Sequence, residues 1–175
     1  LAVSVRRNGV YQMAEIDPRF RTYYIADEVI CENLTARMLK AFGISLGLAT
    51  NLAGSAAYSP EELRSPEFTQ KYGITASVMD NVLYNYLAQP GDKEKGVVLI
   101  VDKPGVCDAF TLKYLYAATS ENESDMLKKW AMEHDGDPRY FYGKRSPAYA
   151  TDPRCQNYDL GNVPIASLYA QIAHV

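Results

Sequence analysis

The sequence has 175 residues, of which 47% are hydrophobic and 22% are charged, and its formal net charge is −3. This composition is that of an ordinary globular chain and predicts a single domain over residues 1–175. The weak acidity and the lack of a basic stripe argue against a nucleic-acid-binding protein, and no apolar run is long enough to span a membrane. No signal peptide is recognisable and the chain has no initiator methionine, so we expect a piece of a longer protein or a processed product.

The first twenty residues predict extended and turn structure. Residues 2–13 alternate weakly between apolar and polar, and Asn8-Gly9 is a typical hairpin dipeptide. Residues 16–21 contain Asp-Pro-Arg, which predicts a turn fixed by the proline ring.

A long helix is predicted from about Glu28 to Leu48, with Asp27 as its N-cap and Gly54 in the turn that ends it. Its apolar residues cover well over half of the circumference, which predicts a helix buried on most faces. One narrow stripe, about 80° wide, differs because it carries small residues around a single lysine. The stripe consists of Asn33, Ala36, Lys40, Gly43 and Gly47. It is either a packing groove from which the lysine reaches water, or a surface that a ligand approaches closely.

The remaining elements are shorter. Two helical starts, Ser59-Pro60-Glu61 and Ser65-Pro66-Glu67, each place serine at the cap and proline at the first helical position. Strands are predicted at Val97–Val101 and Tyr140–Tyr142, and helices at Pro104–Ala118, from a capping box at Ser120–Glu123 to about His134, and at Gly161–His174. His134 near a helix C-terminus suits the helix dipole, and this role is favoured over catalysis.

The segment KAFGISLGLATN, residues 40–51, resembles the zinc-binding helix of metzincin-type metallopeptidases, whose pattern is His-Glu-x-x-His-x-x-Gly-x-x-His. It more narrowly resembles a family of large secreted or periplasmic zinc-dependent metallopeptidases first catalogued as domains of unknown function. Residues 63–73 match a further string of that family, and Ser77-Val78-Met79-Asp80 resembles the Met-turn that lies beneath the zinc. Together the matching strings extend over about residues 11–175.

This resemblance implies a mainly α (α+β) fold. The chain would be the C-terminal part of a metzincin-like catalytic domain, with a long central helix, a Met-turn, several further helices and few short strands. The sheet-containing half that precedes the zinc helix in the family is mostly missing from this sequence. The resemblance also implies a secreted or periplasmic location.

The metal-binding positions depart from the family pattern. Lys40 and Ile44 replace the first two histidines, Ala41 replaces the general-base glutamate, and Thr50 replaces the third histidine. A lysine ammonium repels a dication, and isoleucine and alanine offer no lone pair. The chain contains two histidines, so a three-histidine site cannot be built from it alone. We therefore expect no metal, no other cofactor and no catalytic residue.

The sequence favours a catalytically inactive metallopeptidase relative that serves as a binding or scaffold module for an extended peptide or another protein. The alternatives are an enzyme that uses another chemistry or metal ligands from a segment outside this chain, and a purely structural assembly domain. The degenerate cleft would consist of Lys40, Ala41, Ile44, Thr50, Asn51, Met79 and Asp80. Its lysine ammonium would either occupy the vacated metal space, with Thr50, Asn51 and Asp80 as acceptors, or extend into solvent.

Two further residue types leave alternatives open. The three cysteines, Cys31, Cys107 and Cys155, have no metal-site spacing, and their odd number leaves at least one free thiol. They are expected to be structural, and the sequence cannot choose a disulfide pair. The fourteen tyrosines are an excess that either lines a binding surface or packs in the core with solvated hydroxyls. The candidates for the surface are Tyr84, Tyr86, Tyr140, Tyr142 and Tyr149.

Overall fold

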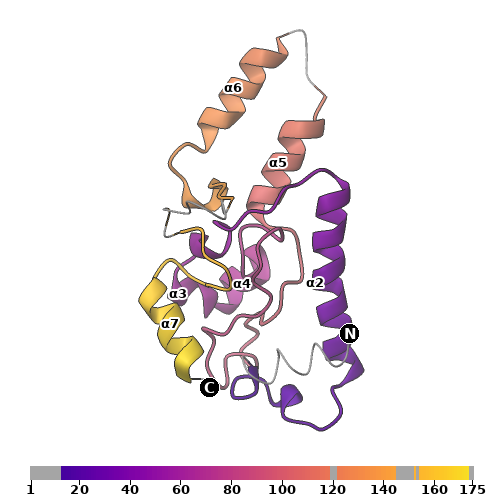
Figure 1. Ribbon diagram of the computed structural model, residues 1–175, viewed down its shortest axis with the longest axis vertical. Helices are drawn as coiled ribbons and strands as arrows, with labels where there is room; N and C mark the ends of the chain where they lie inside the picture. The colour runs from indigo at the N-terminus through magenta and orange to yellow at the C-terminus, as the bar shows by residue number, and fades with distance from the viewer. Residues whose placement is uncertain (1–12, 119–121, 145–151, 153, 174–175) are drawn as a thin grey trace.

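The computed structural model describes residues 13–118, 122–144, 152 and 154–173. Within these residues the protein is mainly helical (Figure 1). The α-helices are α2 (Asp27–Ser45), α3 (Pro60–Leu63), α4 (Pro66–Tyr72), α5 (Val106–Tyr116), α6 (Glu123–Glu133) and α7 (Pro164–Ala173). Three short 3-10 helices are η1 (Pro18–Phe20), η2 (Ser55–Ala57) and η3 (Pro138–Tyr140). The hairpin predicted around Asn8-Gly9 lies outside the described residues.

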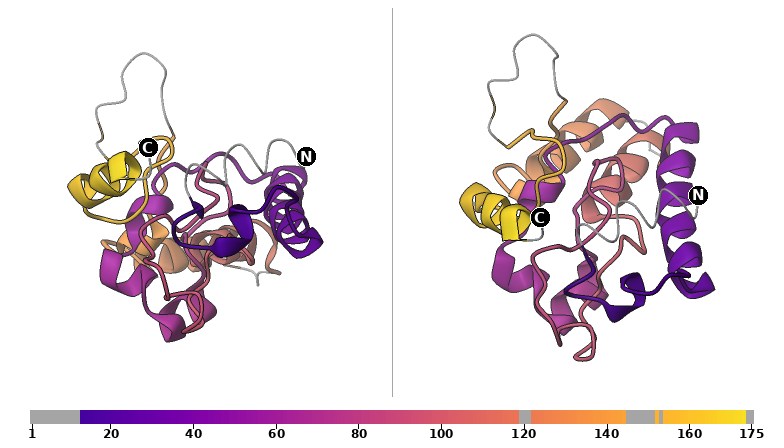
Figure 2. Two further views of the ribbon diagram at one scale, coloured as in Figure 1. Left: turned by 90° about the horizontal axis from the view of Figure 1, so that it is seen from below. Right: turned by 60° about the horizontal axis from the view of Figure 1, so that its bottom comes forward.

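The long helix α2 and the C-terminal helix α7 lie on opposite sides of the molecule in all three ribbon views (Figures 1 and 2). Between them lie α3, α4 and the irregular segment that joins α4 to α5. Helices α5 and α6 extend together away from this body, at the top of Figure 1. No helix in the described part of the chain is long and apolar enough to cross a membrane.

The irregular segment 74–101 forms the centre of the hydrophobic core. Ile74, Met79 and Tyr84 are at most 2% exposed, and they pack in one cluster with Phe20 of η1 and Val29 of α2. Without a regular ladder, this segment depends on buried side chains and turn hydrogen bonds for its conformation.

The bounds of α2 differ from the prediction at both ends. Ala26 is the N-cap and Asp27 is the first helical residue. The helix ends at Ser45, because Gly47 adopts a φ of 85°, a left-handed conformation that favours glycine. The predicted end at about Leu48 was therefore three residues too late, and the turn begins before Gly54.

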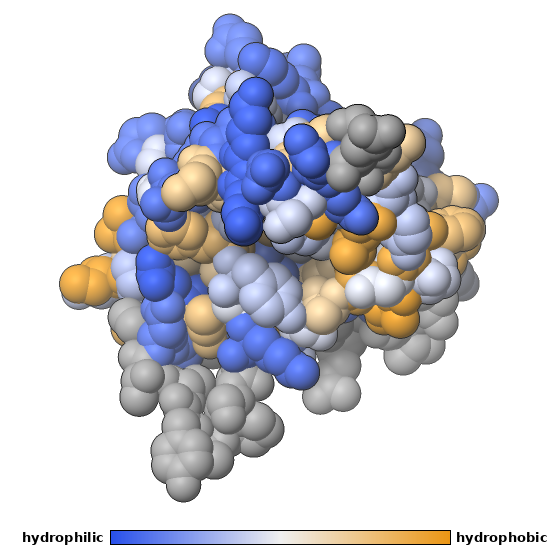
Figure 3. Space-filling view, turned by 90° about the horizontal axis from the view of Figure 1, so that it is seen from above, coloured by the Kyte–Doolittle hydropathy of each residue, from blue (hydrophilic) through white to orange (hydrophobic). Residues whose placement is uncertain are grey.

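The prediction that α2 is buried on most faces is wrong. Its buried residues are Val29, Asn33, Ala36 and Gly43, which include three members of the narrow small-residue stripe. Most of the large apolar residues of the helix and its C-cap are exposed: Leu34 43%, Met38 47%, Phe42 60%, Ile44 61% and Leu46 43%. Leu39 is partly buried and packs against the core. Hydrophobic surface on the side of the molecule where α2 lies is visible from above (Figure 3).

Close approach explains why the small-residue stripe faces the core. A Cβ atom added to Gly43 would lie 2.6 Å from Met79 Sδ, so the thioether fills the space that a side chain would need. The broad apolar face offers no such close fit and is only partly covered by the described residues. The structure thus uses the narrow stripe as the packing groove that the sequence suggested.

The two serine-proline helix starts are confirmed. The Ser59 hydroxyl accepts from the Glu62 N–H at 3.2 Å, and the Glu62 carboxylate accepts from the Ser59 N–H at 2.8 Å. The Ser65 hydroxyl likewise accepts from the Phe68 N–H at 3.2 Å. Each cap satisfies one free N–H group of the first turn of its helix with a residue close in sequence.

Both predicted strands are wrong, and two helices begin later than expected. Residues 97–101 form no strand and make one isolated antiparallel bridge, between Tyr84 and Ile100, so pairing is limited to residues 99–101. Residues 138–140 form the 3-10 helix η3 instead of a strand, because Asp137 caps the turn through the Arg139 N–H. Helix α5 begins at Val106 and α7 begins at Pro164, each two or three residues after its predicted start. Helix α6 begins after Asn122, and the predicted capping residues 120 and 121 lie outside the described range.

The sequence Asp-Pro-Arg occurs three times, and its aspartate and arginine make the same contacts in each copy. In each copy the aspartate accepts a hydrogen bond from the arginine N–H at 3.0 Å and also from the guanidinium of the same arginine. The pairs are Asp17 with Arg19, Asp137 with Arg139, and Asp152 with Arg154. The aspartate–arginine pair that closes the turn therefore lies within the Asp-Pro-Arg sequence itself.

Candidate functional site

Lys40 lies at the centre of the candidate site, on the buried side of α2. Its Nζ donates to the Asp80 carbonyl oxygen at 2.8 Å and to Asn81 Oδ1 at 2.7 Å. Burial lowers the pKa of Lys40 from its ordinary value, and the nearby Asp80 carboxylate opposes that change. The lysine nitrogen therefore has two fixed oxygen partners and is not simply a group extended into water.

The oxygen partners belong to a turn formed by residues 77–81, called here the Met79 turn. Its conformation depends on Asp108 of α5, which is 2% exposed. One Asp108 oxygen accepts from the Ser77 hydroxyl at 2.6 Å, and the other accepts from the Val78 N–H at 2.8 Å and the Gly105 N–H at 2.9 Å. The buried Asp108 carboxylate thus fixes the Met79 turn against α5. The fixed turn then presents two oxygens to Lys40.

Two carboxylates lie beside Ser55. Asp80 is buried and accepts from the Ser55 N–H at 2.8 Å and from the Asn81 N–H at 2.6 Å, while burial raises its pKa. The Ser55 hydroxyl donates to Asp159 at 3.0 Å. Burial, with a smaller contribution from the Asp80 charge, raises the pKa of Asp159 to about 6. The site therefore combines one amine with two carboxyl groups that resist ionisation.

Asn51 does not accept a hydrogen bond from Lys40. Its amide nitrogen donates to the Phe141 carbonyl at 3.1 Å, and its oxygen accepts from the Ala53 N–H at 3.2 Å and the Gly143 N–H at 2.9 Å. The buried Asn51 side chain thus fastens the segment that follows η3.

The structure brings together Lys40, Met79 and Asp80 from the predicted cleft. Ala41, Ile44 and Thr50 are exposed, and Ile44 is 61% exposed. The predicted acceptors Thr50 and Asn51 are therefore wrong, whereas Asp80 takes part through its main-chain oxygen. Asn81, Asp108 and Asp159 were not found from the sequence. The Asp-Asn pair after Met79 offered a weak signal, but the Ser77–Asp108 contact joins residues 31 positions apart.

The residues at the motif positions do not fit a zinc ion. The lysine nitrogen uses its hydrogens on two oxygens, and the other three positions carry alanine, isoleucine and a neutral hydroxyl. Within the described ranges there is no group of three or more histidine, cysteine, aspartate or glutamate side chains that could hold a metal ion. No catalytic step through a metal is therefore assigned to this chain.

His134 lies away from the cleft. It is the C-cap of α6, as expected, and its ring stacks on Tyr140 with centroids 3.7 Å apart. Phe110 of α5 contacts the same ring edge-on at 5.1 Å. The residue therefore joins α6 to α5 and η3 through aromatic packing.

The tyrosines divide between core and surface. Tyr84 and Tyr86 are at most 2% exposed, and their hydroxyls bond to Asn33 and to Ser167. These two tyrosines therefore pack in the core and do not line a binding surface. Tyr142 is 58% exposed, and Tyr149 lies outside the described residues. All three cysteine thiols are free, with Cys107 and Cys155 buried and Cys31 exposed.

A long helix that packs through a glycine onto a methionine-containing turn, followed by further helices, defines a metzincin-like domain. The chain belongs to the Met-zincin family, whose model matches residues 24–175. This match confirms the resemblance found in the sequence and the mainly helical fold. No curated protein and no solved structure matches the chain.

Proposed function

We propose that the chain is a catalytically inactive relative of the zinc metallopeptidases that serves as a binding or scaffold module. The observation that carries the proposal is the Lys40 nitrogen, which donates at 2.8 and 2.7 Å to two oxygens of the Met79 turn. This lysine stands where the family pattern has its first histidine. An amine bound in this way holds helix and turn together, which is a structural role that a ligand–metal contact otherwise fills.

The other substitutions support the same proposal. Hydrolysis by this family needs a base beside a metal-bound water, and Ala41 at the base position has no group that takes a proton. Ile44 and Thr50 add no ligand of sufficient strength. The hydrogen bonds of Asp108 to the Met79 turn involve no metal, and they support a turn that protein groups alone hold in place.

A domain of this kind keeps the shape of a peptidase and none of its chemistry. Its partner would be an extended peptide or another protein, since that is the class of molecule its active relatives act on. A secreted or periplasmic location is part of the proposal and rests on the family alone.

The experiment is a hydrolysis assay with a quenched-fluorescent peptide library, with and without added zinc. The purified chain is compared with a variant that restores the pattern through Lys40→His, Ala41→Glu, Ile44→His and Thr50→His. We expect no cleavage by the unmodified chain at any zinc concentration. Zinc-dependent cleavage by the unmodified chain that a chelator abolishes, and that copurifies with the protein through two further columns, would overturn the proposal.

A further inference from the structure

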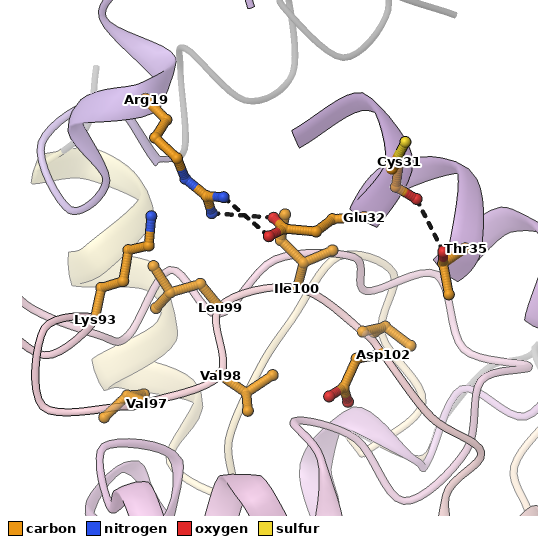
Figure 4. Close-up of a pocket in the computed structure, with 11 residues that line it drawn as sticks. Arg19, Cys31, Glu32, Thr35, Lys93, Val97, Val98, Leu99, Ile100 and Asp102 are labelled. Atoms are coloured by element: carbon orange, nitrogen blue, oxygen red, sulfur yellow. Dashed lines mark hydrogen bonds and ion pairs between the residues drawn. The ribbon is translucent and has the colours of Figure 1, made fainter. Parts of the chain in front are cut away.

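A groove separate from the Lys40 cleft lies between the N-terminal half of α2 and the extended segment 97–102 (Figure 4). Its volume is about 430 Å³. Cys31, Glu32 and Thr35 line it from α2, and the mostly apolar run from Val97 to Asp102 lines the opposite wall. An extended peptide can add to such a wall as a further strand where the wall has an unpaired backbone edge.

One backbone edge of the segment 99–101 is unpaired among the described residues. The Asn85 N–H donates to the Leu99 carbonyl at 2.9 Å and the Val101 N–H donates to the Leu83 carbonyl at 3.2 Å. Antiparallel geometry therefore turns the N–H and C=O of Ile100, between these two bonds, to the other side of the segment. Neither group bonds to any residue of the described ranges, although Ile100 is 5% exposed. A buried backbone pair without partners is costly, and a second extended chain satisfies both groups at once.

The charges of the groove favour a basic occupant. The Arg19 guanidinium is already paired with Asp17 and Glu32, at 2.8 and 2.9 Å. Lys93 is paired with Asp17 at 3.2 Å. Asp102 has a weaker partner, since Lys103 lies 3.6 Å away and also donates to the Gln70 carbonyl. The carboxylate of Asp102 is thus the least closely paired charge that lines the groove, and a basic ligand can compete for it.

We propose that this groove binds an extended, basic peptide segment of a partner protein by adding it as a strand to the edge at Ile100. The peptide residue opposite Ile100 exchanges both backbone hydrogen bonds with it and carries a β-branched side chain. In the antiparallel register, the residue two positions earlier in the peptide lies opposite Asp102 and is lysine or arginine. Main-chain pairing supplies affinity, and the ion pair supplies the choice of register. The proposal does not depend on the loss of catalysis.

The test uses a fluorescein-labelled heptapeptide, Thr-Thr-Arg-Thr-Val-Thr-Thr, titrated with the full chain in a fluorescence anisotropy assay. Methylation of the valine nitrogen removes the paired donor and blocks close approach, so we expect at least a tenfold loss of affinity. Methylation of the threonine nitrogen between arginine and valine is the matched control, because that N–H faces away from Ile100, and we expect less than a twofold change. Equal losses from both methylated peptides, or no saturable binding up to 1 mM, would overturn the proposal.

Two protein variants test the charge. Asp102→Asn should remove most of the preference for this peptide over its arginine-to-glutamate counterpart, whereas Asp125→Asn, an exposed change in α6, should leave the preference intact. Preference unchanged in Asp102→Asn would refute the assigned register.

Amide hydrogen exchange at Ile100 identifies the occupant. Fast exchange in the free protein that becomes slow with the peptide supports the proposal. Slow exchange in the free monomer would show that another part of the same chain already covers the edge. Slow exchange that appears together with a dimer at high protein concentration would assign the groove to a second copy. Either of these last two results overturns the peptide assignment.

Discussion

Replacement of Lys40 by methionine tests whether its nitrogen has a structural role. Methionine retains most of the apolar stem but removes the donor to the Asp80 carbonyl and to Asn81 Oδ1. Each acceptor loses a bond from a charged group, worth about 1.5–3 kcal/mol where it is shielded. Lys40 is only partly buried and water can reach the site, so the total is smaller than two such bonds. We expect the free energy of unfolding to fall by about 1–3 kcal/mol.

The assay is urea unfolding followed by far-UV circular dichroism and tryptophan fluorescence, which gives the midpoint and the slope separately. Lys128→Met is the control, because Lys128 is an exposed residue of α6. The midpoint should fall for Lys40→Met at an unchanged slope, and it should not move for the control. A Lys40→Met protein within about 0.5 kcal/mol of the unmodified chain would refute the structural role.

Three further predictions follow from the burial and charge of named residues. Leu46→Asp should cost less than about 1 kcal/mol because Leu46 is 43% exposed, whereas Val29→Asp should unfold the protein because Val29 is 0% exposed; thermal melting of the two variants distinguishes them. The pKa of Asp159 is raised to about 6, so the native state holds the proton more tightly than the unfolded chain does. The free energy of unfolding should therefore decline by about 1–2 kcal/mol, after allowance for solvent screening, as the pH rises from about 4 to 6. Unfolding at several pH values should show this decline, and Asp159→Asn should remove it. Asp108→Ala should lower stability by about 3 kcal/mol because two buried N–H groups and one hydroxyl lose their acceptor, and a measured loss below about 1 kcal/mol would contradict the role given to this carboxylate.

Features determined by neighbouring residues could be predicted from the sequence. The caps of α3 and α4 each join a serine hydroxyl to the N–H group three positions later, so the local sequence specifies them. The turn of Asp17 and Arg19 is closed by the same short-range logic. The prediction of α2 and of the later helices was correct because helices also depend on residues close in sequence.

The face that α2 buries could not be predicted from its hydrophobicity. The apolar residues outnumber the small ones, so the hydrophobic periodicity predicted burial of the broad face. Instead, the stripe that contains Gly43 is buried, because it packs closely against Met79. The strand predicted at Val97–Val101 failed for a similar reason. Its β-branched residues favour extended backbone, yet a ladder needs a neighbouring strand, and segment 83–85 supplies pairing at a single bridge.

The candidate site was predictable in part. The motif spacing located Lys40, Met79 and Asp80, and these residues lie together. The motif could not reveal that the lysine bonds to a main-chain oxygen and to Asn81, since such contacts depend on the exact path of the turn. Asp108 was missed because its partners are remote in sequence.

The most direct test of the central claim is the zinc content of the purified chain, measured by elemental analysis after dialysis against trace zinc. With lysine at the first ligand position, we predict well below 0.1 equivalent per chain, and partial recovery of binding in the variant with Lys40→His, Ala41→Glu, Ile44→His and Thr50→His. One equivalent of tightly bound zinc per unmodified chain would contradict the claim that the Lys40 amine has replaced the metal.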